Sequence, residues 1–461
     1  MLYETINQIT MKSKNMLNFY ALKLNRLKLW MPSSVYNAKS YTPYVKVLLP
    51  IALFVLSVSS PFAKDLTADM PRQIGINESF RFPEKDLLHP SLSPNEKWLV
   101  YRKLSIFSKM GNVISYFLDT TYKKMYYSRI DKSEKIVLPL PKKKLNDVGF
   151  RLEWSQDGKF LALSAEIDDN LSIILIDFSG SKPRLVEYFE AEDIFHWTVG
   201  NALLYSHSSG NIMKKVPGKD PEKAVSLGKG QRAYDFRLAD NGTVLFILGS
   251  SPSWKIYKTN LQNPEHRTLF FESEMTPEFI ISGDGQFALV STRKREKPDY
   301  WSTKLYDLNT NVINLELATH IRNARFSPDS SKLAYKELYE PSKHKITKPH
   351  FFVLDLKTKG AYDYGYGIDQ HFNWTPDGNH IVYSMKCTHE SGVYEYGIFV
   401  VRISDGKEVA KLTSISSDPA PTMSRSGKYI IWQGSDRWEG PVHTFFVVRN
   451  PLDSNLFSAA K

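Results

Sequence analysis

The chain has 461 residues, of which 42% are hydrophobic and 13% aromatic, so it can bury a large core and is not expected to be disordered. Its formal net charge is +11, but residues 1–63 hold seven Lys or Arg and one acidic residue, which accounts for +6 and leaves +5 for the rest. A charge this dilute excludes a dedicated phosphate-binding surface, so nucleic-acid binding is not expected.

An apolar run, VLLPIALFVLSV at residues 47–58, follows a basic N-terminal stretch. Lys39 and Lys46 precede it and small residues up to Ala63 follow it, which is the order of regions in a secretory signal. The run is shorter than the about 20 residues of a spanning helix. We predict that residues 45–63 are a signal peptide cleaved near Ala63, with an uncleaved anchor as the alternative. The protein is then periplasmic or extracellular, and the basic extension at residues 1–44 lies outside the fold.

Residues 64–461 repeat one hairpin pattern eight times. Each copy is a short run ending in a large apolar residue, then a turn built from Ser, Thr, Pro, Asp, Asn or Gly, then an alternating or clustered apolar run. The copies start 41 to 49 residues apart, except for an interval of 62 between the first two, at His89, Arg151, Ile194, Asp235, Glu278, Asn323, His371 and Ala420.

A third β-like run follows each hairpin, as in LSIILIDF and HTFFVVRN, and several copies have a fourth. Four antiparallel strands in each repeat of 40 to 50 residues are typical of a β-propeller. We therefore predict an all-β fold, a single β-propeller of eight four-stranded blades, with seven as the alternative. The last copy lacks a fourth strand, so residues 79–82 are predicted to supply it and close the ring.

The segments FSPDSSKLAY and WTPDGNHIVY resemble the WD40-like Ser-Pro-Asp-Gly repeat of TolB-like β-propellers, and DPAPTMSRSGKYIIW resembles its fuller Asp-x-x-Pro form. The resemblance extends from Asp65 to the C-terminus. It implies the repeat and the propeller architecture. TolB is implied to have a separate α/β domain before six blades, whereas about 25 residues separate Ala63 from the first repeat here. The resemblance therefore implies the architecture and not a place in the Tol-Pal system.

Aligning the copies on the large residue before the turn separates buried from polar positions. That residue and the one two positions earlier are apolar in every copy, which indicates a face packed between blades. The position one before the large residue holds Ser91, Glu153, His196, Arg237, Ile280, Arg325, Asn373 and Thr422. The position three before it holds His89, Arg151, Ile194, Asp235, Glu278, Asn323, His371 and Ala420.

Most of these side chains are polar and are expected to face the central channel. The predicted ligand-binding residues are His89, Arg151, Glu153, His196, Asp235, Arg237, Glu278, Asn323, Arg325, His371 and Asn373. The alternative is that the channel is polar only because water fills it.

Metal and catalytic motifs are weak. His89 and His371 share a position, with His196 and His320 nearby, but the position offers no third His, so no metal or other cofactor is predicted. There is no Gly-x-Ser-x-Gly turn of a serine peptidase, no phosphate-binding loop and no His-Glu-x-x-His helix. Cys387 is the single cysteine, which excludes an intramolecular disulfide.

The sequence favours a non-enzymatic binding or scaffold protein of the envelope, with a protein or peptide partner, or a polar small molecule or saccharide. The alternative is a carbohydrate-active, lyase-type enzyme with a divalent metal in the channel. Two further sets of side chains are candidates for partner contacts. One is the basic cluster at residues 142–145, for which the alternative is a solvated loop. The other is a set of tryptophans, for which the alternative is a packing role: Trp254, Trp301, Trp432 and Trp438.

Overall fold

A computed structural model describes residues 79–81, 87–103, 125–130, 136–250, 252–294, 297–317, 321–337, 350–366, 368–388, 394–404, 408–413, 421–434 and 444–450. The extension at residues 1–44 and the predicted signal peptide lie outside these ranges. Within them, no helix is long and apolar enough to span a membrane.

The described strands form eight four-stranded antiparallel sheets, numbered here as blades 1 to 8 in chain order. Blade 1 contains β2 (Leu87–Leu92), β3 (Trp98–Lys103), β4 (Met125–Arg129) and β5 (Ile136–Val137). Blade 2 contains β6 (Leu145–Trp154), β7 (Phe160–Ile167), β8 (Asn170–Asp177) and β9 (Arg184–Glu190). Blade 3 contains β10 (Phe195–Trp197), β11 (Leu203–Ser206), β12 (Ile212–Lys215) and β13 (Glu222–Val225). Blade 4 contains β14 (Asp235–Leu238), β15 (Thr243–Ser250), β16 (Ser253–Asn260) and β17 (Asn263–Ser273).

The second half repeats this arrangement. Blade 5 contains β18 (Glu278–Ile281), β19 (Phe287–Lys294), β20 (Lys297–Asp307) and β21 (Val312–Leu317). Blade 6 contains β22 (Ile321–Phe326), β23 (Lys332–Glu337), β24 (His350–Asp355) and β25 (Ala361–Tyr366). Blade 7 contains β26 (Ile368–Trp374), β27 (His380–Thr388), β28 (Tyr394–Arg402) and β29 (Glu408–Thr413). Blade 8 contains β30 (Thr422–Met423), β31 (Tyr429–Gly434), β32 (Thr444–Arg449) and β1 (Ser79–Arg81).

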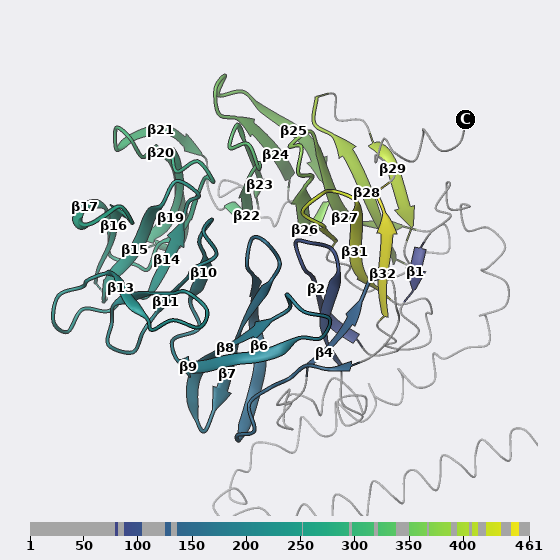
Figure 1. Cartoon of the computed structure of the whole chain (residues 1–461). Helices are drawn as coiled ribbons and strands as arrows, with labels where there is room; N and C mark the ends of the chain where they lie inside the picture. Colours follow the sequence, from purple (N-terminus) through teal and green to yellow (C-terminus); the bar gives the residue numbers. More distant parts are fainter. Residues whose placement is uncertain are drawn as a thin grey trace, which may run out of the picture. The chain divides into compact units, whose positions relative to one another are not determined.

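The fold is the predicted eight-bladed β-propeller. The first strand of a blade is the innermost, since the first strands of neighbouring blades contact one another, as β14 and β18 or β22 and β26 do. The ring closes as predicted, because β1 pairs with β32, with Ser79 opposite Val448 (Figure 1). The closing blade thus joins both ends of the described chain and leaves no open edge at that position.

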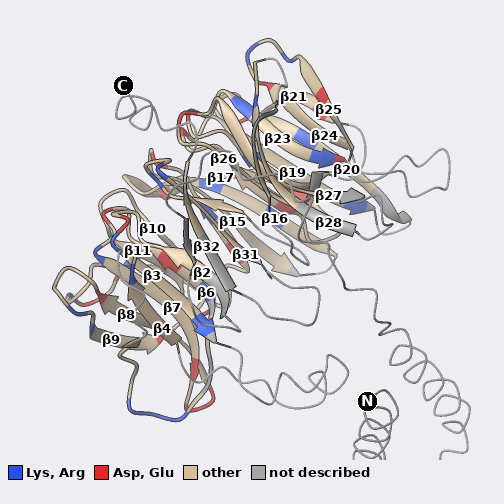
Figure 2. Cartoon of the chain, turned by 90° about the vertical axis from the view of Figure 1, so that its right-hand side faces the viewer, with Lys and Arg blue, Asp and Glu red and all other residues tan. Residues whose placement is uncertain are grey.

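Hydrophobic clusters lie between neighbouring blades. Of the clusters in the described part, one joins blades 1 and 2 through Trp98, Trp154 and Phe178, and another joins blades 8 and 1 through Tyr101 and Ile431. The residue two positions before the large residue is buried in five blades, as predicted for the packed face. These residues are Phe195, Phe236, Phe279, Phe372 and Pro421. In the described part of the chain, positions of Lys and Arg and of Asp and Glu are both found on loops and strands (Figure 2).

The turn between the first and second strands is the same in every blade. The N–H of its fourth residue donates to the carbonyl of its first, over 2.8–3.0 Å. In six blades the Ser or Thr hydroxyl at the first position also accepts the N–H five residues further on, at 2.9–3.0 Å. The fourth residue has a positive φ in all eight blades, which favours Gly. The eight are Glu96, Gly158, Asn201, Gly242, Gly285, Ser330, Gly378 and Gly427.

Neighbouring turns also contact one another. The Asn95 side chain donates to the Gly158 carbonyl at 3.0 Å, and the Asn241 side chain donates to the Asp284 carbonyl at 2.7 Å. A Cβ atom on Gly158 would lie 2.9 Å from Asn95, and one on Gly285 would lie 2.5 Å from Asn241. The repeated Gly is therefore required by the adjacent blade as well as by its own turn.

Candidate functional site

The two polar positions of each inner strand share one face, because side chains two residues apart on a strand point the same way. In blade 2, Arg151 Nη2 lies 3.9 Å from Glu153 Oε2. In blade 4, Asp235 and Arg237 form an ion pair, and Arg237 also donates to the Phe236 carbonyl at 2.9 Å. The predicted alternation between packed and polar positions thus holds on both strands.

Several of these polar side chains bond one blade to the next. Arg151 donates to the Phe195 carbonyl at 2.8 Å, and its Nη2 lies 3.3 Å from His196 Nε2. His196 in turn has Nδ1 3.4 Å from Glu153 Oε2 and Nε2 3.2 Å from the Phe236 carbonyl oxygen. Arg151, Glu153 and His196 therefore form a cluster, here called the blade 2–3 cluster, that also reaches blade 4.

A similar chain of contacts joins blades 6, 7 and 8. Arg325 donates to the Asn373 side-chain oxygen, and Asn373 donates to the Pro421 carbonyl at 2.5 Å. The Trp374 indole N–H donates to the Arg325 carbonyl at 3.0 Å. These hydrogen bonds satisfy polar groups that would otherwise face the channel unpaired, and they fix the spacing of the inner strands.

Two arginines in the channel have lowered pKa values. Burial is the main cause of the lowered pKa of Arg151. The charge of Glu153 opposes this effect, and the charge of Arg237 adds to it. Burial alone lowers the pKa of Arg325, although its side chain still contacts solvent. Both guanidinium groups remain charged near neutral pH, because arginine is the most basic side chain in proteins.

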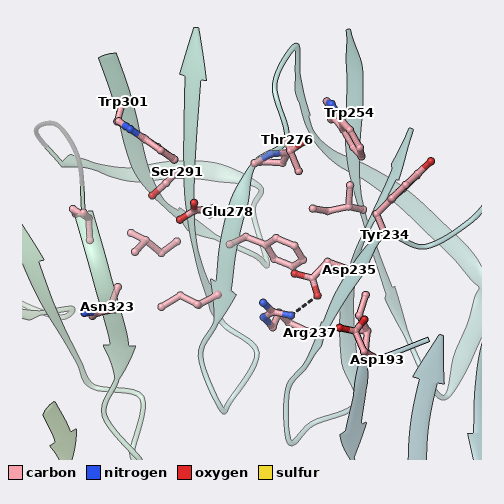
Figure 3. A pocket seen from close by; sticks show the side chains of 18 of the residues that line it. Asp193, Tyr234, Asp235, Arg237, Trp254, Thr276, Glu278, Ser291, Trp301 and Asn323 are labelled. Atoms are coloured by element: carbon pink, nitrogen blue, oxygen red, sulfur yellow. Dashed lines mark hydrogen bonds and ion pairs between the residues drawn. The ribbon is translucent and has the colours of Figure 1, made fainter. Parts of the chain in front are cut away.

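A cavity of about 890 Å³ lies at the end of the channel where the inner strands begin (Figure 3). Blades 2 to 6 contribute to it. Five predicted site residues line it: Arg151, Asp235, Arg237, Glu278 and Asn323. The structure therefore brings together about half of the predicted ligand-binding set in one place.

The other predicted residues are placed differently. Glu153, His196, Arg325 and Asn373 do not line the cavity and instead make the contacts between blades described above. His371 does not line the cavity either. The side chain of His89 and the whole of His320 lie outside the part of the chain that the structure describes.

β-bulges occur in several inner strands but do not by themselves explain this division. The inner strands of blades 1, 2, 6 and 7 have shifts in register against their second strands, whereas those of blades 3, 4 and 5 pair regularly. His371 lies in the bulge of β26, between Ile368 and Phe372, where three residues oppose one. Asp235 and Glu278 are in regular register, opposite Ile247 and Ser291. Arg151 lies in an equivalent bulge of β6, between Val148 and Leu152, and Asn323 lies in the bulge of β22, yet both line the cavity.

The alignment of repeats missed several lining residues, namely Asp193, Tyr234, Thr276 and Pro277. Asp193, Tyr234 and Pro277 each lie four positions before the large residue of their repeat, so extending the alignment by one position shows them together. Trp254 and Trp301, considered from the sequence as stacking residues, also line the cavity. Trp254 meets Tyr234 edge to face, with ring centroids 5.0 Å apart.

The remaining candidates have structural surroundings. Trp432 is buried between blades 7 and 8. In the basic cluster, Lys143 and Lys144 form ion pairs with Asp168 and Asp169 at 3.4 and 2.7 Å, as expected of a solvated loop. Trp438 and the Cys387 side chain lie outside the described residues. Among the residues described, no group of three or more His, Cys, Asp or Glu side chains is arranged to hold a metal ion.

The comparisons with known proteins show the fold. The Dos1 propeller matches with a TM-score of 0.51 and 13% identity over 80% of this chain and 94% of that chain. The crystal structure of a eukaryotic initiation factor matches with a TM-score of 0.51 and 12% identity over 79% of this chain and 86% of that chain. No protein-family model and no curated protein matches the chain.

An oligogalacturonate lyase from Vibrio parahaemolyticus also matches, over 80% of this chain and 98% of that chain. Its TM-score is 0.48 and its identity is 12%, values too low to support any argument about activity. At identities of 12 to 13%, all of these likenesses concern the fold alone. The chain is therefore an eight-bladed β-propeller, and the solved structures named above have different names that indicate no common function.

Proposed function

We propose that this chain is an exported, TolB-like β-propeller that acts as a non-enzymatic binding protein and holds a peptide segment of an envelope partner in the cavity. The observation that carries the proposal is the cavity itself, to which five blades contribute charged, polar and aromatic side chains. Its volume of about 890 Å³ lies within the range of about 300–1,000 Å³ typical of ligand sites.

The blade 2–3 cluster supports binding over catalysis. Glu153 and His196 have the chemistry of a general base, but both are engaged in contacts that hold neighbouring blades together. Glu153 accepts the Trp197 backbone N–H at 3.2 Å, and His196 approaches the Phe236 carbonyl at 3.2 Å. A residue that fixes the spacing of inner strands is poorly suited to move a proton in each turnover.

Charge argues against the lyase-type alternative. The cavity is lined by three carboxylates, Asp193, Asp235 and Glu278, and by two guanidinium groups, Arg151 and Arg237. A polyuronate substrate would bring further carboxylates into a site where negative charge is already in excess. A peptide or another ligand that is not anionic fits this lining better.

Export and TolB-like character are supported by the sequence. The apolar run at residues 47–58 has the flanks of a secretory signal, and the Ser-Pro-Asp-Gly type turns recur in most blades. Intact-mass measurement of the protein purified from the envelope fraction tests export, with a mature chain beginning near Lys64 as the expected result. A full-length chain found in the cytoplasm would contradict it.

Site-specific photocrosslinking tests the binding site. A photoreactive residue in place of Thr276, which is exposed at the cavity, is expected to crosslink an envelope protein. The matched control is the same residue at Val199, which is 52% exposed in the turn at the other end of β10. Crosslinks that form equally at both positions, or at Val199 alone, would show that the partner does not bind in the cavity.

A further inference from the structure

The charges that line the cavity are only partly compensated within the protein. Arg237 forms an ion pair with Asp235, and Arg151 lies 3.9 Å from Glu153. Glu278 differs from these groups: within the described ranges it has neither a hydrogen bond nor an ion pair, and its side chain is exposed. The cavity therefore presents a carboxylate whose charge is available to a ligand.

Glu278 is held at a defined position. It is the first residue of β18 and pairs in regular register with Ser291, which is buried and bonded to Thr303 at 2.9 Å. Its side chain points into the cavity beside Ser291, with Trp301 above it and Trp254 and Tyr234 across from it (Figure 3). A carboxylate on a paired strand is positioned by the sheet and not by a loose loop.

One aromatic side chain, Trp254, adds to this preference for a cation. Arg232 lies over the Tyr234 ring at 5.8 Å and Arg293 lies over the Trp301 ring at 5.0 Å, so the two rings already carry cations. Trp254 is the third aromatic side chain of this wall, and no cation–π contact to it is present in the described part. Indole faces attract ammonium and guanidinium groups, most strongly where water is partly excluded.

We infer that the cavity binds the positively charged end of a Lys or Arg side chain of a peptide, with the cation bonded to Glu278 and resting against Trp254. This inference rests on the proposed function and names the chemical group that the site recognises. The cavity is larger than a free amine requires, which favours a side chain together with its flanking backbone. The exposed carboxylate of Asp193 adds to the negative potential on the opposite wall.

The test is calorimetric titration with a capped peptide that carries one Lys among Gly and Ser residues. The comparison peptide has acetyl-lysine at the same place, which keeps the shape and removes the charge, and butylamine tests the free amine. Glu278→Gln is the variant, and Glu274→Gln, an exposed carboxylate outside the cavity, is its matched control. Glu278→Gln is expected to unfold at the same temperature as the parent, because the carboxylate of Glu278 makes no hydrogen bond or ion pair within the described residues and the strand pairing uses only its backbone.

The Lys peptide is expected to bind at least about tenfold more tightly than the acetyl-lysine peptide, the effect typical of one charge-assisted hydrogen bond. Glu278→Gln should lose this difference and Glu274→Gln should keep it. Equal binding of both peptides would overturn the inference and leave the binding function standing. If butylamine binds as tightly as the Lys peptide, the inference that the site recognises a peptide and not a free amine is overturned. Failure of every probe, together with no crosslink at position 276, would overturn the inference and the proposed function alike.

Discussion

Replacing Gly285 by Ala tests how tightly neighbouring blades are joined at their turns. The backbone φ of Gly285 is +70°, a conformation that costs an L-residue about 1–2 kcal/mol. The new Cβ would lie 2.5 Å from Asn241 Oδ1 and 2.6 Å from its Nδ2. Asn241 cannot move away without weakening its bonds to the Asp284 carbonyl at 2.7 Å and from the Thr243 N–H at 2.9 Å, each contributing about 0.5–1.5 kcal/mol. We expect a loss of about 2–5 kcal/mol in the free energy of unfolding.

Urea denaturation followed by tryptophan fluorescence measures this loss. Gly218→Ala is the matched control, because Gly218 has a φ of +78° and no atom within 4 Å of a Cβ built there. The control should lose only the backbone contribution of about 1–2 kcal/mol. Equal losses in the two variants would refute the reasoning, since they would show that the contact between the turns of blades 4 and 5 contributes nothing to stability.

Three further predictions concern the repeat. Burial alone would raise the pKa values of Asp157, Asp329 and Asp377, but hydrogen bonds from the turn backbone and hydroxyl groups lower them overall. These carboxylates therefore stabilise the fold above their unfolded pKa of about 3.9, and urea midpoints should fall as pH drops below that value; a midpoint unchanged down to pH 3 would contradict this. Trp374→Phe loses the indole hydrogen bond to the preceding blade together with part of a buried ring, and should lower the unfolding free energy by at least the contribution of that bond, about 0.5–1.5 kcal/mol, whereas no change would show the bond to be unimportant. Phe236→Ala removes a fully buried ring between blades 3 and 4 and should cost about 3–5 kcal/mol in calorimetry, with a loss below 1 kcal/mol as the contrary result.

The candidate site was predicted only in part. Asp235, Arg237 and Glu278 line one cavity, on strands that pair in regular register and by alternation place them on one face. His371 was predicted for the same ring and does not line the cavity, although Arg151, in an equivalent bulge, does. Which of these side chains reaches the cavity depends on the packing of neighbouring blades, and local alternation carries no signal for it. The ligand-binding role of the whole set remains a prediction.

Some aromatic residues show the same limit. Trp254 and Trp432 are both large residues in short strands, and their sequence surroundings do not distinguish them. The structure places Trp254 at the cavity and Trp432 in the core between blades 7 and 8. Which face of a strand is covered depends on the neighbouring blade, and that neighbour is specified only once the ring has closed.

The sequence by itself determined the fold of this protein. Its eight turns, six of which have Gly or Asn at the position with positive φ, and its alternating runs are local features, so their physical meaning can be recognised without any contact between distant residues. It also indicated that β1 would complete blade 8. Only the tertiary structure decided which polar side chains meet and which are already paired. Glu153 and Glu278 occupy similar inner strands, yet one bonds two blades together and the other faces the cavity, because partners for a side chain come from neighbouring blades.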